Sequence, residues 1–80
     1  MIFSSHYIVY PEGDTQEISH RLRINQITDI NGVPLSLPLP TPKMIAYRVY
    51  KIQTQDLRGE ERTYFFLELL RINELEELSR

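Results

Sequence analysis

One short segment contains four prolines, and each of them occupies an even-numbered position: Pro34, Pro38, Pro40 and Pro42. Proline lacks a backbone N–H, and the shared parity of these prolines places the missing donors on one side of a strand, so this segment is expected at the edge of a sheet rather than at its centre. The odd-numbered positions from Val33 to Leu39 are apolar. The alternation predicts an edge strand over residues 33–39 that pairs with residues 24–30 and is blocked by its prolines on the other side.

The turn before this strand is predicted at Asn31-Gly32, because Asn-Gly between apolar residues favours a two-residue type I′ hairpin. That turn places Ile30 opposite Val33. Residues 16–30 then read as one long bent strand shared by two hairpins.

The first hairpin is predicted from residues 2–10, the turn signal at residues 11–14, and residues 15–24. A four-residue turn puts Tyr10 opposite Thr15. This register gives the two strands one polar face and one apolar face. Ile2 and Ile8 are exceptions on the polar face. The apolar face carries Phe3, Ser5, Tyr7, Val9, Gln16, Ile18, His20, Leu22 and Ile24. A helix over residues 15–24 is the alternative, because residues 14–17 have the pattern of a capping box.

The second half of the chain predicts a strand over residues 43–53, a polar loop over residues 54–61, and a strand over residues 63–70. The unbroken apolar run of the last strand indicates cover on both faces, although such a run could also begin a helix. Asn73 is predicted to cap a short C-terminal helix. The fold expected for residues 1–80 is a single, mainly β domain: a five-stranded antiparallel twisted sheet or small partly open barrel, with one short C-terminal helix.

Several function classes are disfavoured by what the sequence lacks. It has no cysteine, no glycine-rich phosphate loop, no apolar run of about 20 residues and no secretory leader, so we expect a cytoplasmic protein without a cofactor or membrane span. The register above puts His6 and His20 on opposite faces of the hairpin, which excludes a shared metal. No serine is placed to pair with a histidine base, so an enzyme is not expected.

The remaining candidates are binding surfaces. Aromatic and basic residues interleave on one strand and are joined by two arginines of the first hairpin; the candidate binding residues are Tyr47, Arg48, Tyr50, Lys51, Arg21 and Arg23. We expect Tyr47 and Tyr50 to point to opposite faces. A small β-barrel that binds nucleic acid is the alternative function, but the net charge of −2 disfavours it. A non-enzymatic module that binds another protein, or itself through an edge strand without prolines, is the favoured prediction.

Overall fold

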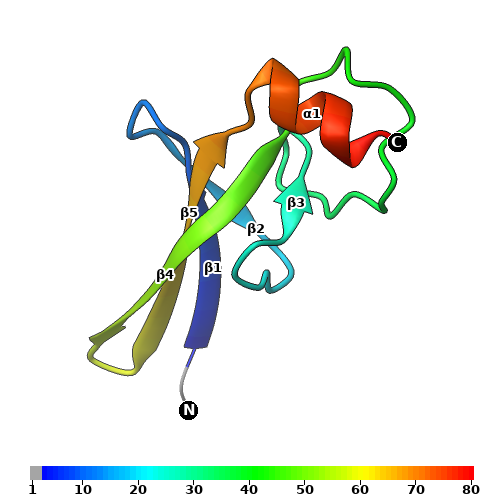
Figure 1. Ribbon diagram of the computed structural model, residues 1–80. Helices are drawn as coiled ribbons and strands as arrows, with labels where there is room; N and C mark the ends of the chain where they lie inside the picture. The colour runs from blue at the N-terminus through cyan, green and yellow to red at the C-terminus, as the bar shows by residue number, and fades with distance from the viewer. Residues whose placement is uncertain (1–2) are drawn as a thin grey trace.

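The computed structural model describes residues 3–80 and consists of one five-stranded sheet and one helix (Figure 1). The elements in chain order are β1 (Phe3–Val9), β2 (Thr15–Ile18), β3 (Ile27–Thr28), β4 (Tyr47–Leu57), β5 (Glu60–Leu69) and α1 (Ile72–Leu78). The strand order across the sheet is β2-β1-β5-β4-β3, and the sheet curves into a half-barrel. The predicted class, mainly β with five strands and a short C-terminal helix, is therefore confirmed.

The sheet is mixed rather than wholly antiparallel, which corrects one part of the prediction. β1 runs parallel to β5, with Tyr7 opposite Tyr64 and Ile8 opposite Phe65. A parallel pair needs a long crossover connection rather than a hairpin, and the chain between β1 and β5 supplies it through β2, β3 and β4. No local turn signal specifies this pairing.

The register of the first hairpin differs from the prediction by one residue. Val9 lies opposite Thr15, because the loop has only three residues and closes with hydrogen bonds from the Tyr10 N–H to the Asp14 carbonyl and from the Gly13 N–H to the Tyr10 carbonyl. Gly13 has φ of 100°, which this loop geometry requires. The slip turns the even-numbered residues of β1 inward, so Ile8 is completely buried. Ile2 lies outside the described residues.

The Asn31-Gly32 hairpin has the same three-residue loop, so its predicted two-residue turn is wrong as well. The Asp29 N–H donates to the Val33 carbonyl, and the Gly32 N–H donates to the Asp29 carbonyl at 3.1 Å. The Asp29 carboxylate accepts two further backbone N–H groups inside the loop. A two-residue hairpin turn lies instead at Arg58-Gly59, both with positive φ, and the predicted loop over residues 54–61 is strand on either side of it.

Residues 15–24 form neither the predicted long strand nor the alternative helix. β2 ends at Ile18, and residues 19–26 cross to the opposite edge of the sheet, where β3 pairs with β4. Because β2 and β3 lie on opposite edges, one continuous strand cannot join them. Leu22 is buried within this crossing segment.

The proline segment is an edge, but it is not a regular strand. Its described contacts with β3 are one bridge between Thr28 and Pro34 and a hydrogen bond from the Leu35 N–H to the Ile27 carbonyl. Farther along, the Leu39 N–H donates to the Leu78 carbonyl of α1. The segment therefore leaves the sheet to pass under the helix. The predicted pairing with residues 24–30 is only partly confirmed.

Two apolar clusters lie on one side of the sheet, which we call the inner face. The first fills the curve of the half-barrel and contains Ile8, Ile18, Leu22, Tyr47, Val49, Phe65 and Leu67. The second lies beneath α1 and contains Ile27, Leu39, Ala46, Leu70 and Leu75. The helix begins after Arg71, two residues before the predicted cap, and its Glu74 carboxylate accepts the Arg71 N–H. Leu75 and Leu78 face inward, as predicted.

Candidate functional site

The other side of the sheet, the outer face, carries a row of aromatic side chains. The Tyr7 and Tyr64 rings stack at 5.3 Å between centroids, and the Tyr50 and Phe66 rings are 6.4 Å apart. We call these four residues the aromatic strip. Tyr7, Tyr64 and Phe66 are partly buried, and Tyr50 is 51% exposed. The strip therefore presents aromatic surface to solvent on the face opposite both apolar clusters.

A shallow groove of about 290 Å³ lies beside two residues of the strip, Tyr64 and Phe66. It is lined by Val9, Thr15, Gln53, Gln55, Tyr64 and Phe66. The apolar floor comes from β1 and β5, and the glutamine amides from β4 form one wall. Apolar surface with a few hydrogen-bonding groups at its margin is the usual chemistry of a recognition surface.

The apolar run of β5 has its explanation here. Thr63, Phe65 and Leu67 point to the inner face and are buried, whereas Tyr64 and Phe66 alternate with them on the outer face. The sequence predicted cover on both faces of this strand, and only the inner face has it.

Charged residues frame the strip, and most of them are paired. Arg48 contacts Glu68 at 3.1 Å and also bonds to Glu74. Arg62 contacts Glu60 at 2.9 Å, and its hydrogen bonds hold the pKa of Glu60 below its usual range. Lys51 has no ion pair among the described residues; its Nζ lies 5.1 Å from the centre of the Phe66 ring, in a cation–π arrangement.

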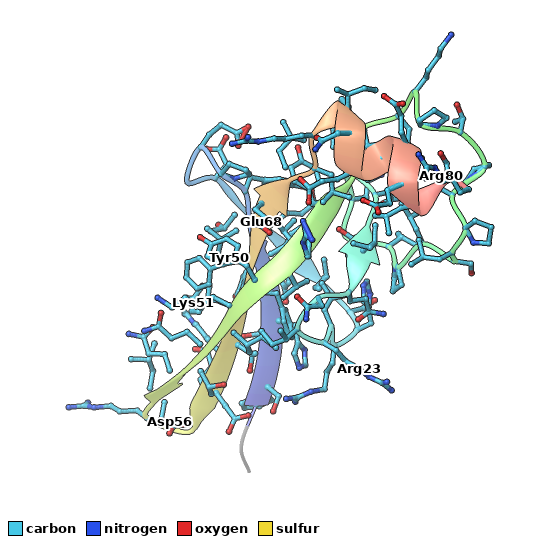
Figure 2. The ribbon with its side chains drawn as sticks, in the orientation of Figure 1. Arg23, Tyr50, Lys51, Asp56, Glu68 and Arg80 are labelled. Atoms are coloured by element: carbon cyan, nitrogen blue, oxygen red, sulfur yellow. The ribbon has the colours of Figure 1, made fainter. Side chains whose placement is uncertain are left out.

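The structure brings together only part of the predicted site. Tyr50, Lys51 and Arg48 share the outer face, whereas Tyr47 is buried in the core with its ring edge-on to Tyr10 at 5.7 Å. The expectation that Tyr47 and Tyr50 point to opposite faces is confirmed. Arg23 projects from the other side of the sheet (Figure 2), on the exposed crossing segment that also carries Arg21.

The sequence reasoning missed Tyr7, Tyr64, Phe66 and the two glutamines. The alternation of Tyr64 and Phe66 with Thr63 and Phe65 was a usable signal, because a strand with two apolar faces must cover both or expose one. The stack between Tyr7 and Tyr64 depends on the parallel pairing of β1 with β5, which had no sequence signal.

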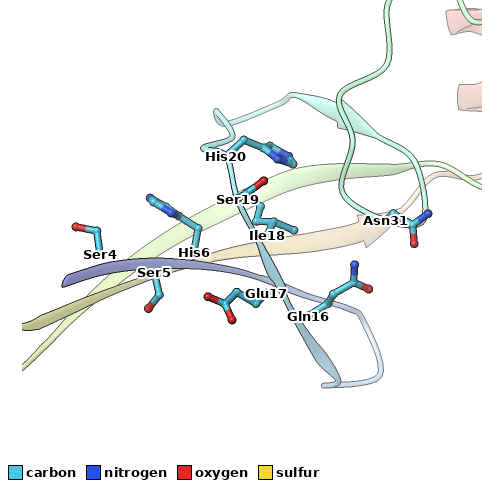
Figure 3. A pocket seen from close by; sticks show the side chains of 9 residues that line it. All are labelled: Ser4, Ser5, His6, Gln16, Glu17, Ile18, Ser19, His20 and Asn31. Carbon is cyan, nitrogen blue, oxygen red and sulfur yellow. The ribbon is translucent and has the colours of Figure 1, made fainter.

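A second hollow lies at the edge formed by β1 and β2 (Figure 3). It has a volume of about 640 Å³ and is lined by Ser4, Ser5, His6, Gln16, Glu17, Ile18, Ser19, His20 and Asn31. His6 and His20 lie on the same side of the hairpin, so their predicted placement on opposite faces is wrong. The cause is the one-residue difference in the register of the first hairpin. His20 Nε2 lies 2.8 Å from the Gly32 carbonyl, and His6 Nε2 is buried with no hydrogen-bond partner among residues 3–80.

Residues 3–80 hold neither a metal-binding cluster nor a membrane-crossing helix. In this part of the chain, no group of three or more His, Cys, Asp or Glu side chains converges closely enough to hold a metal ion. None of these residues belongs to a helix with the length and apolarity that a bilayer crossing demands.

Comparison with known proteins gives a family and no further relative. No curated protein and no solved structure matches the chain. One protein family, described as "Uncharacterised Treponema protein", matches residues 2–78. Because the match covers nearly the whole sequence, the chain belongs to this Treponema family.

Proposed function

We propose that this domain is a non-enzymatic binding module whose outer sheet face docks another protein through the aromatic strip. The observation that carries the proposal is the position of the strip: aromatic side chains are concentrated on the face that neither α1 nor the long connections cover. Tyrosine, phenylalanine and arginine are enriched at protein interfaces, and a few anchor residues, often tyrosine, tryptophan or arginine, dominate the binding energy in many of them.

The margin of the strip supports protein recognition. Gln53 and Gln55 offer amide donors and acceptors beside the groove, and Lys51 lies over Phe66. An apolar centre with a polar rim is the arrangement that excludes water around buried anchor residues. The absence of cysteine is compatible with a reducing compartment, and the proposal places the module in the cytoplasm.

The test is affinity capture from the source cell, followed by titration of the purified captured protein against defined variants. Tyr64→Ala and Phe66→Ala should each weaken binding by about tenfold or more, because each removes an aromatic anchor. Leu37→Ala is the matched control, because Leu37 is 54% exposed but lies in the proline segment. Equal affinity of all three variants and the wild type would refute the proposal.

Single-stranded nucleic acid is a second candidate, because Tyr50, Phe66 and Lys51 combine aromatic rings with a cation on one face. The electrostatics favour it less. Arg48 and Arg62 are paired with glutamates, and Arg23 projects from the opposite side of the sheet.

The two candidates are separated by the salt dependence of binding. Fluorescence anisotropy with short single-stranded DNA and RNA should show no affinity at physiological salt if the module binds protein. If it binds nucleic acid, affinity must fall steeply as salt rises, and the double variant Arg48→Ala/Lys51→Ala must flatten that slope.

A further inference from the structure

The β4 strand has a free edge along more than half of its length. β5 pairs with β4 from Tyr47 to Leu57, but β3 pairs only with Tyr47 and Arg48 on the other side. Backbone hydrogen bonds from the Asn25–Gln26 loop extend that cover to Val49. From Lys51 to Leu57, no strand among residues 3–80 lies against the second edge.

The backbone groups on this edge follow from the Arg58-Gly59 turn. Leu57 and Glu60 flank a two-residue turn, so they form a hydrogen-bonded pair, and alternate residues of β4 continue that pattern. The residues between them, namely Ile52, Thr54 and Asp56, direct their N–H and C=O groups away from β5. Each of these residues therefore offers one donor and one acceptor to an incoming strand.

This edge lacks the protection that the other edges have. Pro34 lies beside β3, and β2 is only four residues long. The segment from Lys51 to Leu57 contains no proline or glycine, and its register with β5 is regular throughout. Long, regular, unblocked edges are the ones that accept another strand.

We propose that a second copy of this chain occupies the edge, with two β4 strands paired antiparallel about a two-fold axis at Thr54. The free segment is symmetric about Thr54, so this register satisfies every free group of Ile52, Thr54 and Asp56 in both copies. It pairs Thr54 with Thr54 of the second copy and Gln53 with Gln55.

Charge is compatible with this register. The charged side chains of the segment are Lys51 and Asp56. In the antiparallel pair, Lys51 lies opposite Leu57 and Asp56 lies opposite Ile52, so no like charges face each other. Like charges directly opposite are the usual obstacle to self-pairing of strands.

The shape of the molecule leaves the edge accessible. The radius of gyration is 13.7 Å, against about 12 Å for a compact domain of this length. The β4–β5 hairpin accounts for the elongation, because its tip extends away from α1 and the proline segment (Figure 1). A second hairpin can therefore approach the edge without meeting the helix. The inference is independent of the proposed function, which uses the outer face of the sheet rather than its edge.

Sedimentation velocity over a concentration series tests the proposal. A strand-edge contact is at the small end of protein interfaces, so we expect a reversible dimer that dissociates in the micromolar range. Thr54→Pro removes a free N–H and should raise the dissociation constant of the dimer at least about tenfold, so that the protein sediments as a monomer. The reason is that this one substitution eliminates the hydrogen bonds that both copies make at the axis. Thr54→Val keeps the N–H and a β-branched side chain, so it should remain a dimer.

A crosslink keeps the test decisive if Thr54→Pro does not fold. The chain has no cysteine, so Thr54→Cys creates a single thiol at the two-fold axis, where Cα atoms of a hydrogen-bonded pair lie about 5.5 Å apart, within disulfide range. This variant should form a disulfide-linked dimer on mild oxidation. Thr15→Cys, on the edge strand β2, should not. A wild-type monomer at millimolar concentration, a folded Thr54→Pro dimer, or crosslinking through position 15 instead of 54 would overturn the proposal.

Discussion

The two halves of β4 are built from one continuous strand and differ in almost every physical respect. The first half, around the buried Tyr47 and Val49, has β5 on one side and β3 with the Asn25–Gln26 loop on the other, whereas the residues from Lys51 to Leu57 are exposed and paired only with β5. The change occurs at a bulge, where Val49 lies opposite Leu67 and Lys51 lies opposite Phe66. The first half therefore supports the fold, and the second half offers surface.

The bulge also explains why the binding residues gather where they do. One extra residue in β4 places both Tyr50 and Lys51 on the outer side, next to Phe66. Without it, strict alternation would send one of the two side chains inward. The same irregularity ends the buried half of the strand and begins the exposed half.

The largest expected loss of stability distinguishes the two faces of β5, because neighbouring residues of this strand point to opposite faces. Phe65→Ala should cost roughly 3–5 kcal/mol, because Phe65 is 1% exposed and packs in the main cluster. A domain of this size has a total stability of roughly 4–12 kcal/mol, so the variant should lose from about a quarter to all of it. Urea denaturation followed by circular dichroism measures the loss.

Phe66→Ala is the matched control for that variant. Phe66 lies on the outer face and is only partly buried, so its removal should cost about 1 kcal/mol. Similar losses at both positions would mean that the outer face is covered in the folded protein, which would contradict the division between the faces.

The next effect compares the two three-residue loops. Gly32 has φ of 80°, and a Cβ there would lie 3.1 Å from Ile8 Cδ1, so Gly32→Ala should cost roughly 2–3 kcal/mol through strain and overpacking. Gly13 has φ of 100° but no atom within 4 Å of such a Cβ, so Gly13→Ala should cost only about 1 kcal/mol. Thermal denaturation of the two variants gives the ranking, and a larger loss at Gly13 would contradict it.

These loops also show what the sequence could and could not predict. The presence of turns near Gly13, Gly32 and Gly59 was readable, because glycine supplies the positive φ that each turn needs. Loop length was not readable from the same residues, and an error of one residue reverses which side chains face the core. The sequence reasoning therefore found the first strand but assigned Tyr7 inward and Ile8 outward.

The candidate site was predictable to the extent that it is local. Arg48 and Tyr50 are two residues apart, so strand alternation alone places them on one face, whereas Lys51 joins them only because of the bulge. Tyr7 and Tyr64 are far apart in the chain, and they meet through a parallel pairing that closes a long crossover. Such pairings are set by the overall packing of the sheet rather than by a short pattern, so the aromatic strip as a whole was not visible in the sequence.

A smaller effect is expected at the junction between the sheet and the helix. Glu74 bonds to Arg48 of β4 and also accepts the Arg71 N–H at the start of α1. Glu74→Ala should cost about 1 kcal/mol, because the ion pair is about one-third exposed and is screened by solvent. Glu77→Ala, on the same helix without an ion pair in the described residues, should change stability by less than about 0.5 kcal/mol. Equal losses in urea denaturation would contradict this role for Glu74.

Alkaline pH should destabilise the fold through the buried half of β4. Burial raises the pKa of the Tyr47 hydroxyl, with a further contribution from the charge of Glu12. The unfolded chain therefore ionises this tyrosine first, and the stability it contributes is full below pH of about 10 and is lost as pH rises through the folded pKa. Tyr47→Phe should make the alkaline loss shallower in denaturation experiments across this range.

Acid pH should have the smallest effect, and it acts on the exposed half of the sheet. Hydrogen bonds from Arg62 lower the pKa of Glu60, which lies next to the hairpin turn. The sign is opposite to that of Tyr47: the stability contributed by Glu60 is present above its unfolded pKa, near 4.5, and is lost as pH falls through the lower folded pKa. Glu60→Gln should therefore flatten the acid limb slightly and leave the alkaline limb unchanged. Because the ion pair is about one-third exposed, about 1 M salt should reduce even this small difference between the variant and the wild type. An acid limb that changes strongly in Glu60→Gln would mean that the hairpin tip supports the fold as firmly as the buried half of β4 does.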